Sequence, residues 1–225
     1  MSLRTIGAFA TYVPRQLVRQ LLALDPAARR ASEQRELTVM FTDLTGFSRM
    51  AERLPAQETA RLLNDHFRRL TACIVAEGGT VDKFLGDAVM AFWGAPERQD
   101  NHAARAVRAA ATMQEAFQDD PLLREHGLGL RIGLHTGMVL VGDIGTADRL
   151  NYTIVGDAVN VAARLVELGH EAGGRQGVAV LLSETTVRAA GAQALVEDLG
   201  DRAIRGRDRA ERVYRLPRLC LTHRA

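Results

Sequence analysis

The chain has 225 residues, of which 47% are hydrophobic and 25% charged, as in one ordinary globular domain with a short appendage. Its formal net charge of +2 and its aromatic content of 5% argue against nucleic-acid binding. No apolar run approaches 18 residues, no signal peptide opens the chain, and Cys73 and Cys220 form no CxxC pair. We therefore expect a cytoplasmic protein without structural zinc and without membrane contact by this segment, although a longer parent protein could be membrane-anchored.

The first 35 residues differ from the rest of the chain. An apolar stripe over Leu17–Leu24 predicts a short helix that Asp25-Pro26 ends, and the Arg-rich stretch Ala27–Arg35 is typical of a linker. The stripe is too short to span a membrane, so we expect it to pack on the domain or on a partner helix. The predicted organisation is an N-terminal helical segment with a linker, a folded domain and a C-terminal tail, at 1–35, 36–218 and 219–225.

The stretch Leu37–Met50 predicts a strand, a tight turn and the start of a helix. Its β-branched and apolar run ends at Asp43, and the turn-forming pair Thr45-Gly46 precedes a segment with helical periodicity. A carboxylate beside the free N–H groups of a helix start suits metal-bound phosphate. Taken alone, however, Asp43 is more readily interpreted as a helix cap.

The next elements are a helix and a hairpin. Apolar residues at helical spacing predict a helix over Gln57–Glu77, and we interpret His66 beside that stripe as packed or solvated rather than as a ligand. Thr80–Phe84 and Ala88–Trp93 predict a β-hairpin with Asp87 at its tip.

A second long helix is expected over Asn101–Phe117. After it, Leu128–His135 and Met138–Gly142 predict two strands joined by a turn at Thr136-Gly137. His135 would then end a strand near a turn, where a role as metal ligand or base is a minor alternative.

The C-terminal part continues the alternation of strands and helices. Tyr152–Val155 predicts a short strand, and Asp157 is the expected N-cap of a helix that runs to about Gly169. The remaining expected elements are a strand, a helix and two strands, at Val178–Leu182, Ser183–Ala190, Ala194–Asp198 and Arg212–Leu216. Strands joined by tight hairpins must be antiparallel, so we expect an α+β fold with a ferredoxin-like, antiparallel-core sheet flanked by helices.

Asp43 and Asp87 both follow β runs, and an antiparallel core could bring them together. Two carboxylates in a small space repel each other unless a cation neutralises them, and divalent ions with phosphate oxygens are the usual solution. Backbone N–H groups of Thr45, Gly46 and Phe47 would then face the phosphates. The alternative is that the two aspartates are unrelated surface residues at turns.

On the predicted third helix, Asn160 and Arg164 are four residues apart and share a face. Such an amide and guanidinium could hold a reacting phosphoryl group. Equally, Arg164 could pair with a surface acid.

Four segments, FTDLTGFS, DKFLGDAVMAFWG, RIGLHTG and NYTIVGDAVNVAARL, resemble in this order the catalytic domain of class III nucleotidyl cyclases, from about Glu36 to Leu216. The resemblance implies a ferredoxin-like domain that works as a homodimer, with active sites at the subunit interface. It also implies two divalent metal ions, Mg²⁺ or Mn²⁺, with which the ribose 3′-hydroxyl attacks the α-phosphate to give a cyclic nucleotide and pyrophosphate.

The resemblance assigns a role to each matching residue. Asp43 and Asp87 match the metal carboxylates, and Leu44 would supply a backbone carbonyl to the metal. Asn160 would orient the ribose, and Arg164 would stabilise charge developing at the α-phosphate. A looser match places Arg205 at a triphosphate-binding position, where a solvated arginine is an equal alternative.

Two family positions choose the base, and here they are Lys83 and Thr153. A lysine donor and a threonine acceptor fit adenine, whereas the N1–H of guanine requires a carboxylate in place of Lys83, so ATP is the expected substrate. Thr153 is similar to the bacterial and soluble subgroup in which bicarbonate activation is often seen, which makes bicarbonate a candidate activator.

The resulting hypothesis is a homodimeric adenylyl cyclase, with regulatory domains in a longer parent chain as further candidate partners. A guanylyl cyclase and a catalytically silent regulatory or dimerisation module are the alternatives. Lys83 argues against the first, and the presence of both aspartates with Asn160 and Arg164 argues against the second. No GGDEF-like run supports a diguanylate cyclase.

Overall fold

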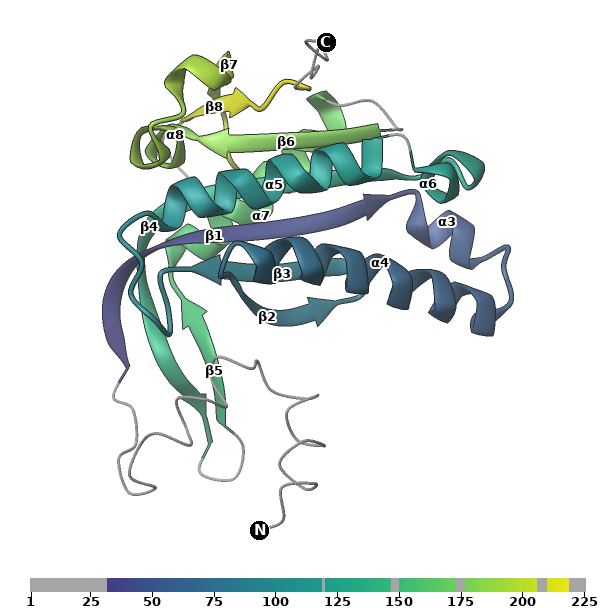
Figure 1. Cartoon of the computed structure of the whole chain (residues 1–225), viewed down its shortest axis with the longest axis horizontal. Helices are drawn as coiled ribbons and strands as arrows, with labels where there is room; N and C mark the ends of the chain where they lie inside the picture. Colours follow the sequence, from purple (N-terminus) through teal and green to yellow (C-terminus); the bar gives the residue numbers. More distant parts are fainter. Residues whose placement is uncertain (1–31, 119, 147–149, 173–176, 206–209, 219–225) are drawn as a thin grey trace, which may run out of the picture.

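The structure is a computed structural model of the whole chain, and it describes residues 32–118, 120–146, 150–172, 177–205 and 210–218 (Figure 1). The predicted N-terminal helix over Leu17–Leu24, the tail 219–225 and Cys220 lie outside the described residues. Among the helices that are described, none is both long and apolar enough to cross a membrane.

A single eight-stranded sheet runs through the centre of the molecule (Figure 1). Its strands are β1 (Glu33–Thr45), β2 (Thr80–Leu85), β3 (Ala88–Trp93), β4 (Gly129–Gly145), β5 (Leu150–Val155), β6 (Gly177–Ser183), β7 (Glu197–Arg202) and β8 (Glu211–Arg215). Their order is β2-β3-β1-β4-β6-β8-β7, with β5 paired to β4 beside this path. Among the described strands, all pairs are antiparallel except β4 with β6. The predicted α+β class is confirmed.

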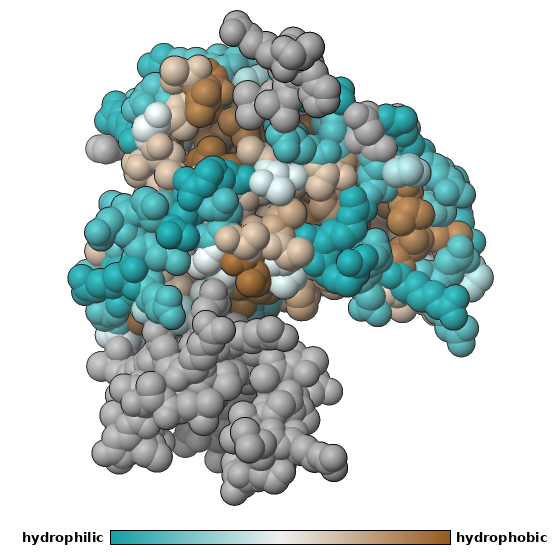
Figure 2. Space-filling model, in the orientation of Figure 1, coloured by the Kyte–Doolittle hydropathy of each residue, from teal (hydrophilic) through white to brown (hydrophobic). Residues whose placement is uncertain are grey.

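Helices cover both faces of the sheet. They are α3 (Phe47–Ala51), α4 (Ala56–Ala76), α5 (His102–Gln118), α6 (Pro121–Glu125), α7 (Asp157–Ala172), α8 (Glu184–Ala190) and the 3₁₀ turn η1 (Gln193–Leu195). Successive side chains of β1 pack on opposite faces of the sheet. Met40 packs with α4, α5 and α8, whereas Val39 packs with α7. The outer surface of the α4 and α5 layer is mainly hydrophilic, because the apolar sides of these helices face the sheet (Figure 2).

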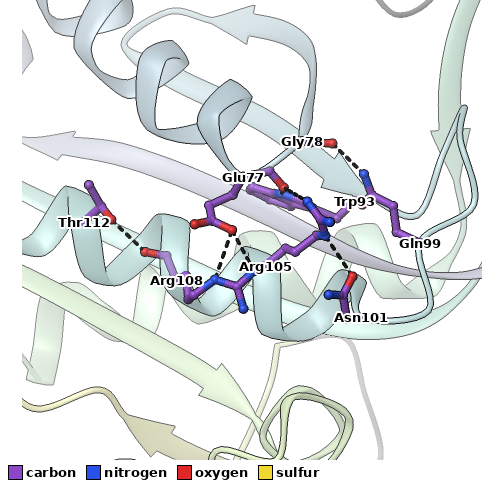
Figure 3. Close-up of polar contacts among 8 residues, drawn as sticks. All are labelled: Glu77, Gly78, Trp93, Gln99, Asn101, Arg105, Arg108 and Thr112. Atoms are coloured by element: carbon purple, nitrogen blue, oxygen red, sulfur yellow. Dashed lines mark hydrogen bonds and ion pairs between the residues drawn. The ribbon is translucent and has the colours of Figure 1, made fainter.

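Polar contacts fasten the end of α4 to the start of α5 (Figure 3). The indole N–H of Trp93 donates to the backbone carbonyl of Glu77 at 3.1 Å, and the guanidinium of Arg108 donates twice to the Glu77 carboxylate, at 3.0 and 2.8 Å. The side-chain amide of Gln99 donates to the carbonyl of Gly78 at 2.9 Å. The bonds from Trp93 and Gln99 satisfy carbonyls at the helix end that the helix itself leaves unpaired.

The hairpin predicted over Leu128–Gly142 is wrong. Thr136 and Gly137 lie inside the 17-residue strand β4, paired with Thr38 and Leu37 of β1. The sequence Thr136-Gly137 is typical of a turn, but here the glycine makes room for a helix. A Cβ at Gly137 would lie 3.2 Å from the Cβ of Ala158, so the missing side chain lets α7 approach β4.

Two further boundaries differ from expectation. β1 begins at Glu33, inside the stretch expected to be a linker, because its first residues pair with β4 as far as Val141. β7 begins at Glu197, whereas the sequence places a strand from Ala194. β7 lies at the sheet edge and its residues are exposed or half-buried, so its apolar pattern does not mark it.

The core of the α4 layer contains an uncharged histidine. His66 is 5% exposed, its ring meets Phe117 edge-on, and within the described part of the chain neither ring nitrogen has a hydrogen-bond partner. Burial, with a smaller contribution from Arg69, lowers the pKa of His66 from 6.5 to about 4. The structure shows the packed histidine that was expected, with its ring against Phe67 and Phe117 and with Arg69 and Asp120 nearby.

We expect His66 to destabilise the fold in acid. Because its pKa is lower in the folded state than in the unfolded state, the unfolded state binds more protons between pH 6.5 and pH 4. Stability should therefore fall as the pH drops through this window, by about 2 kcal/mol at pH 5 relative to pH 7. Urea unfolding at both pH values should show a smaller loss for His66→Leu than for the wild type. His126→Gln is the control, and an unchanged loss in His66→Leu would contradict the assignment.

Candidate active site

The two aspartates singled out from the sequence face the same site. Asp43 lies two residues before the end of β1, and Asp87 lies at the tip of the β2–β3 hairpin. The backbone N–H of Leu44 donates to a carboxylate oxygen of Asp87 at 3.2 Å, which ties the hairpin tip to β1. Asp43 does not cap α3, since no side chain caps that helix. The two aspartates are therefore neighbours in the fold, and their role as metal ligands stays a prediction.

The electrostatics of this pair fit a cation. Burial, and then the nearby negative charge of Asp43, raise the pKa of Asp87 above its ordinary value. A divalent ion between the carboxylates would relieve both effects. In the described residues no third acidic, histidine or cysteine side chain completes a metal cluster. Two carboxylates with substrate phosphates and water are the set by which proteins usually hold Mg²⁺.

His170 joins the site from the C-terminal end of α7. Its Nε2 lies 3.2 Å from a carboxylate oxygen of Asp43, and its Nδ1 lies 3.0 Å from the hydroxyl oxygen of Thr45. The ring therefore links the last residues of β1 to the end of the helix. No local pattern in the sequence identified His170, because nothing nearby in the chain relates it to Asp43.

The turn after β1 has the predicted shape. Gly46 adopts φ 90°, a left-handed conformation that favours glycine, and the chain enters the short helix α3 at Phe47. Since no side chain caps α3, its first N–H groups are not bound by a capping residue. This is compatible with the expected phosphate contacts of Thr45, Gly46 and Phe47, which stay predictions.

The two base-selecting candidates meet within one chain. The ammonium of Lys83 on β2 donates to the hydroxyl oxygen of Thr153 on β5 at 3.1 Å. Asp82, which the sequence analysis passed over, lies beside both of them, with a side chain that is 2% exposed. It accepts a hydrogen bond from the Thr153 hydroxyl at 2.5 Å and lies 3.3 Å from the Lys83 ammonium. A carboxylate inside the strand sequence TVDKFL is the signal that could have revealed it.

Asn160 and Arg164 lie on α7, away from its end at His170. Asn160 is exposed, and Arg164 is half-buried and pairs with Glu167 of the same helix at 2.5 Å. At 1.5 Å per residue, Asn160 is about 15 Å and Arg164 about 9 Å along the helix from His170, the α7 residue that contacts Asp43. The two residues thus share a face, as predicted, and both lie along α7 from the residue that contacts Asp43.

Arg205 is exposed in the connection between β7 and β8. Its neighbour Ile204 packs in a small core with Val161 and Leu165 of α7. Arg205 therefore lies on the part of the chain that carries Asn160 and Arg164, and its triphosphate role stays a prediction.

Two other polar side chains of β4, Arg131 and His135, are buried. Arg131 is 0% exposed opposite Asp43 in the register of β1 and β4, and it donates to the carbonyl of Gly177 at 2.9 Å. His135 is 8% exposed and its Nδ1 lies 2.8 Å from the hydroxyl oxygen of Ser183. Its place inside a strand argues against the metal or base role considered above.

Comparison with known proteins identifies relatives over most of the chain. Residues 30–216 match the family described as the adenylate and guanylate cyclase catalytic domain. Adenylate cyclase 1 of Rhizobium meliloti (strain 1021) is 34% identical over 213 residues, which are 93% of this chain and 31% of that protein. This chain thus spans about a third of that relative's length.

Solved structures of both kinds of cyclase are similar to the chain. The adenylyl cyclase CyaB from P. aeruginosa matches with a TM-score of 0.73 and 30% identity, over 84% of this chain and 96% of that one. The guanylyl cyclase Cya2 matches with a TM-score of 0.70 and 31% identity, over 83% and 94%. Because the sequence identities to an adenylyl and a guanylyl cyclase are so close, overall similarity does not decide between adenine and guanine. That choice must be argued from individual residues.

Proposed function

This chain belongs to the adenylate and guanylate cyclase catalytic-domain family, the class III nucleotidyl cyclases, and from that membership we propose that it converts ATP into 3′,5′-cyclic AMP and pyrophosphate. The observation that carries the choice of ATP is the contact of Lys83 with Thr153. Together they offer adenine a donor for N1 and an acceptor for its 6-amino group. Guanine has an N1–H donor and a 6-carbonyl, so it would leave polar groups unpaired in a partly buried site.

The direct test incubates the purified protein with ATP or GTP and with Mg²⁺ or Mn²⁺, and measures cyclic nucleotide and pyrophosphate. Cyclic AMP as the main product would support the proposal. Cyclic GMP as the main product would favour the guanylyl cyclase alternative, and no product from either nucleotide would favour the silent module.

In this proposal Asp43, Asp87 and the backbone carbonyl of Leu44 hold two divalent metal ions, Mg²⁺ or Mn²⁺. When bound, such ions neutralise the phosphates and make the ribose 3′-hydroxyl a better nucleophile. The bond from the Leu44 N–H to Asp87 holds that carboxylate in place beforehand. Burial and the nearby charge of Asp43 raise the pKa of Asp87, and a bound cation would offset both effects.

The other groups bind and orient the nucleotide. The N–H groups of Thr45, Gly46 and Phe47 bind phosphate oxygens, and Arg205 binds the triphosphate. Asn160 orients the ribose so that its 3′-oxygen is in line with the α-phosphate, and Arg164 stabilises the charge that develops there as the bond to the β-phosphate breaks. Arg164 must exchange its contact with Glu167 for the phosphate, which a partly exposed ion pair within one helix allows at little cost.

Each active centre is proposed to form between two copies of the chain. The separation along α7 supports this, since about 15 Å of helix rise lies between Asn160 and His170, the α7 residue that contacts Asp43. Lys83 and Asp87 lie on one hairpin but contact different neighbours, Thr153 and Leu44. One protomer would thus supply the metal carboxylates, and its partner the residues that bind base, ribose and α-phosphate.

An apolar patch on the β4–β5 ribbon supports the homodimer. Met138, Leu140 and Val155 are 56%, 39% and 52% exposed. Leu140 pairs with Val155, and Met138 is two residues from Leu140, so the three side chains share one face. A second copy of the chain would cover them. Activation by bicarbonate and control by domains of a longer parent chain are further proposals that rest on the subgroup resemblance.

Loss of either metal carboxylate should abolish activity without unfolding the protein. Asp43→Asn and Asp87→Asn remove charge but keep shape, so we expect kcat to fall on the order of 10²–10³-fold, the scale for loss of one electrostatic stabiliser. Calorimetric titration with Mn²⁺ and nucleotide should show weaker metal binding, while Tm stays near the wild-type value. Asp201→Asn, an exposed aspartate of β7, is the matched control. Near-normal activity of either variant would exclude the metal role.

Exchange of the base-selecting pair should shift preference toward GTP. Lys83→Glu with Thr153→Cys supplies an acceptor for N1–H and removes the acceptor that faces the 6-amino group. Each mismatch should cost about 1–3 kcal/mol, so the ratio of kcat/KM for ATP to that for GTP should fall strongly. Since Asp82 lies beside Lys83, the pair is also made with Asp82→Asn, which avoids two adjacent carboxylates. An unchanged ratio would mean that these residues do not touch the base.

Mixed dimers should recover part of the activity. Asp43→Ala and Arg164→Ala homodimers should both be inactive, but in a mixed dimer one centre receives both lesions and the other receives none. With random exchange about half of the dimers are mixed, so roughly a quarter of wild-type activity should return. Cyclic AMP formation is measured before and after re-equilibration of an equimolar mixture. An inactive mixture with proven subunit exchange would rule out the shared site.

A further inference from the structure

Asp82 occupies an irregular position in its strand. The pairing of β2 with β3 shifts between Val81 and Lys83, so Asp82 is the extra residue of a β-bulge. Bulges redirect a side chain that regular pairing would place elsewhere. Here the carboxylate is buried against β5, where only 2% of it is exposed and where the backbone of Ile154 also hydrogen-bonds to it.

A buried carboxylate in a strand needs compensation, and the contacts of Asp82 show where it comes from. Burial raises the pKa of Asp82, whereas the bonds from Thr153, Lys83 and the Ile154 backbone act in the opposite direction. Replacing this group by an apolar residue would remove the cost of burial altogether. The position of Asp82 between the two base-selecting side chains points to a role in recognition.

The hydrogen-bonding capacity of Thr153 is almost fully used within the chain. A hydroxyl has one donor and two acceptor positions. The donor goes to Asp82 at 2.5 Å, the short distance of a charge-assisted bond, and one acceptor position takes the Lys83 ammonium at 3.1 Å. Thr153 is 6% exposed, so solvent offers it little else. What remains for a ligand is one acceptor position.

Lys83 presents the opposite polarity. Its ammonium has three donors and no acceptor, of which one goes to Thr153 and another faces Asp82 at 3.3 Å. The third is left for a ligand, and 39% of the side chain is exposed. The three residues together therefore show a donor beside an acceptor, which is the complement of adenine N1 and its 6-amino group.

We propose that Asp82 is a positioning residue for base selection: by accepting the hydrogen bond that the Thr153 hydroxyl donates, it leaves that oxygen as an acceptor toward the nucleotide base. Without that carboxylate the hydroxyl is free to rotate and to donate, and a threonine would then accommodate a 6-carbonyl as readily as a 6-amino group. The inference rests on the proposed function, because it assigns adenine to the site formed by Lys83 and Thr153.

The experiment compares three nucleotides that differ at the 6-position of the base. ATP has a 6-amino group, inosine triphosphate a 6-carbonyl, and purine riboside triphosphate a hydrogen. ATP and purine riboside triphosphate share the N1 acceptor that faces Lys83, so the ratio of their kcat/KM values reports on Thr153 alone. We expect Asp82→Asn to lower this ratio roughly 3- to 10-fold, the value of one hydrogen bond.

Asp82→Asn should also improve the use of a nucleotide with a 6-carbonyl group. The oxygen of the new amide faces Lys83, so its N–H₂ faces Thr153 and turns that hydroxyl toward the base as a donor. The kcat/KM for inosine triphosphate relative to purine riboside triphosphate should then rise. Asp82→Ala removes the acceptor without adding a donor, and serves as the second variant should Asp82→Asn fold poorly. For Asp82→Ala the kcat/KM for ATP relative to purine riboside triphosphate should fall, whereas that for inosine triphosphate relative to purine riboside triphosphate should not rise. Asp201→Asn is the matched control and should change neither ratio.

Two results would overturn the proposal. If Asp82→Asn lowers kcat/KM for all three nucleotides by the same factor, Asp82 only supports the fold. If Asp82→Asn still lowers the ATP ratio when Thr153→Val is already present, Asp82 does not act through Thr153, because the double variant should match Thr153→Val alone.

Binding separates this inference from the proposed activity. The 3′-deoxy forms of the same three nucleotides cannot cyclise, and their Kd values are measured by calorimetry with wild type and variants. A wild-type protein that makes no cyclic AMP but prefers the 6-amino form, and loses that preference with Asp82→Asn, would reject the cyclase activity and keep the inference. A wild-type preference for the 6-carbonyl form would reject the inference.

Discussion

The antiparallel pairing of β1 with β4 is the constraint on which the rest of the molecule depends. The two strands pair without a break from Glu33 opposite Val141 to Thr45 opposite Gly129. β3 adds to the other side of β1 and brings the hairpin tip with Asp87 to Leu44. α7 crosses both strands closely, because a Cβ on Gly133 would lie only 2.4 Å from the backbone oxygen of Ala162. A helix held this near the sheet can place His170 against Asp43.

Charge is distributed unevenly over this scaffold. At one end of β1 two carboxylates face each other, with an inward-facing arginine, Arg131, in the adjacent strand. At the base-selecting position the acid and the cation are neighbours in sequence, and Thr153 connects them. The first arrangement leaves charge to be neutralised by a ligand, whereas the second satisfies its charges internally and leaves single hydrogen-bonding positions for recognition. The two parts of the proposed site therefore use electrostatics in different ways, one for catalysis and one for specificity.

The proposed shared site would explain the exposed apolar side chains of the β4–β5 ribbon. In that proposal each centre takes its metal carboxylates from one protomer and its base-selecting residues from the partner, so it is complete only in a dimer. In the proposed dimer, burial of the exposed Met138, Leu140 and Val155 would contribute hydrophobic free energy to association, which the polar active-site residues do not. Catalysis and oligomerisation are coupled in this view by geometry alone.

The sequence by itself determined the α+β class and most elements, because period-2 and period-3.6 apolar patterns mark strands and helices that are buried on one side. Asp43 and Asp87 stood out as carboxylates at the ends of apolar strands, whereas Lys83 and Thr153 were singled out only by the resemblance of four segments to a known family. Only the tertiary structure decided that Thr136-Gly137 continues β4. The glycine there leaves room for α7, a helix that comes later in the chain and packs against this strand. Likewise, Asp82 hydrogen-bonds to Thr153 and His170 contacts Thr45, partners that lie 71 and 125 residues away in sequence. Local sequence patterns carry no information over such distances.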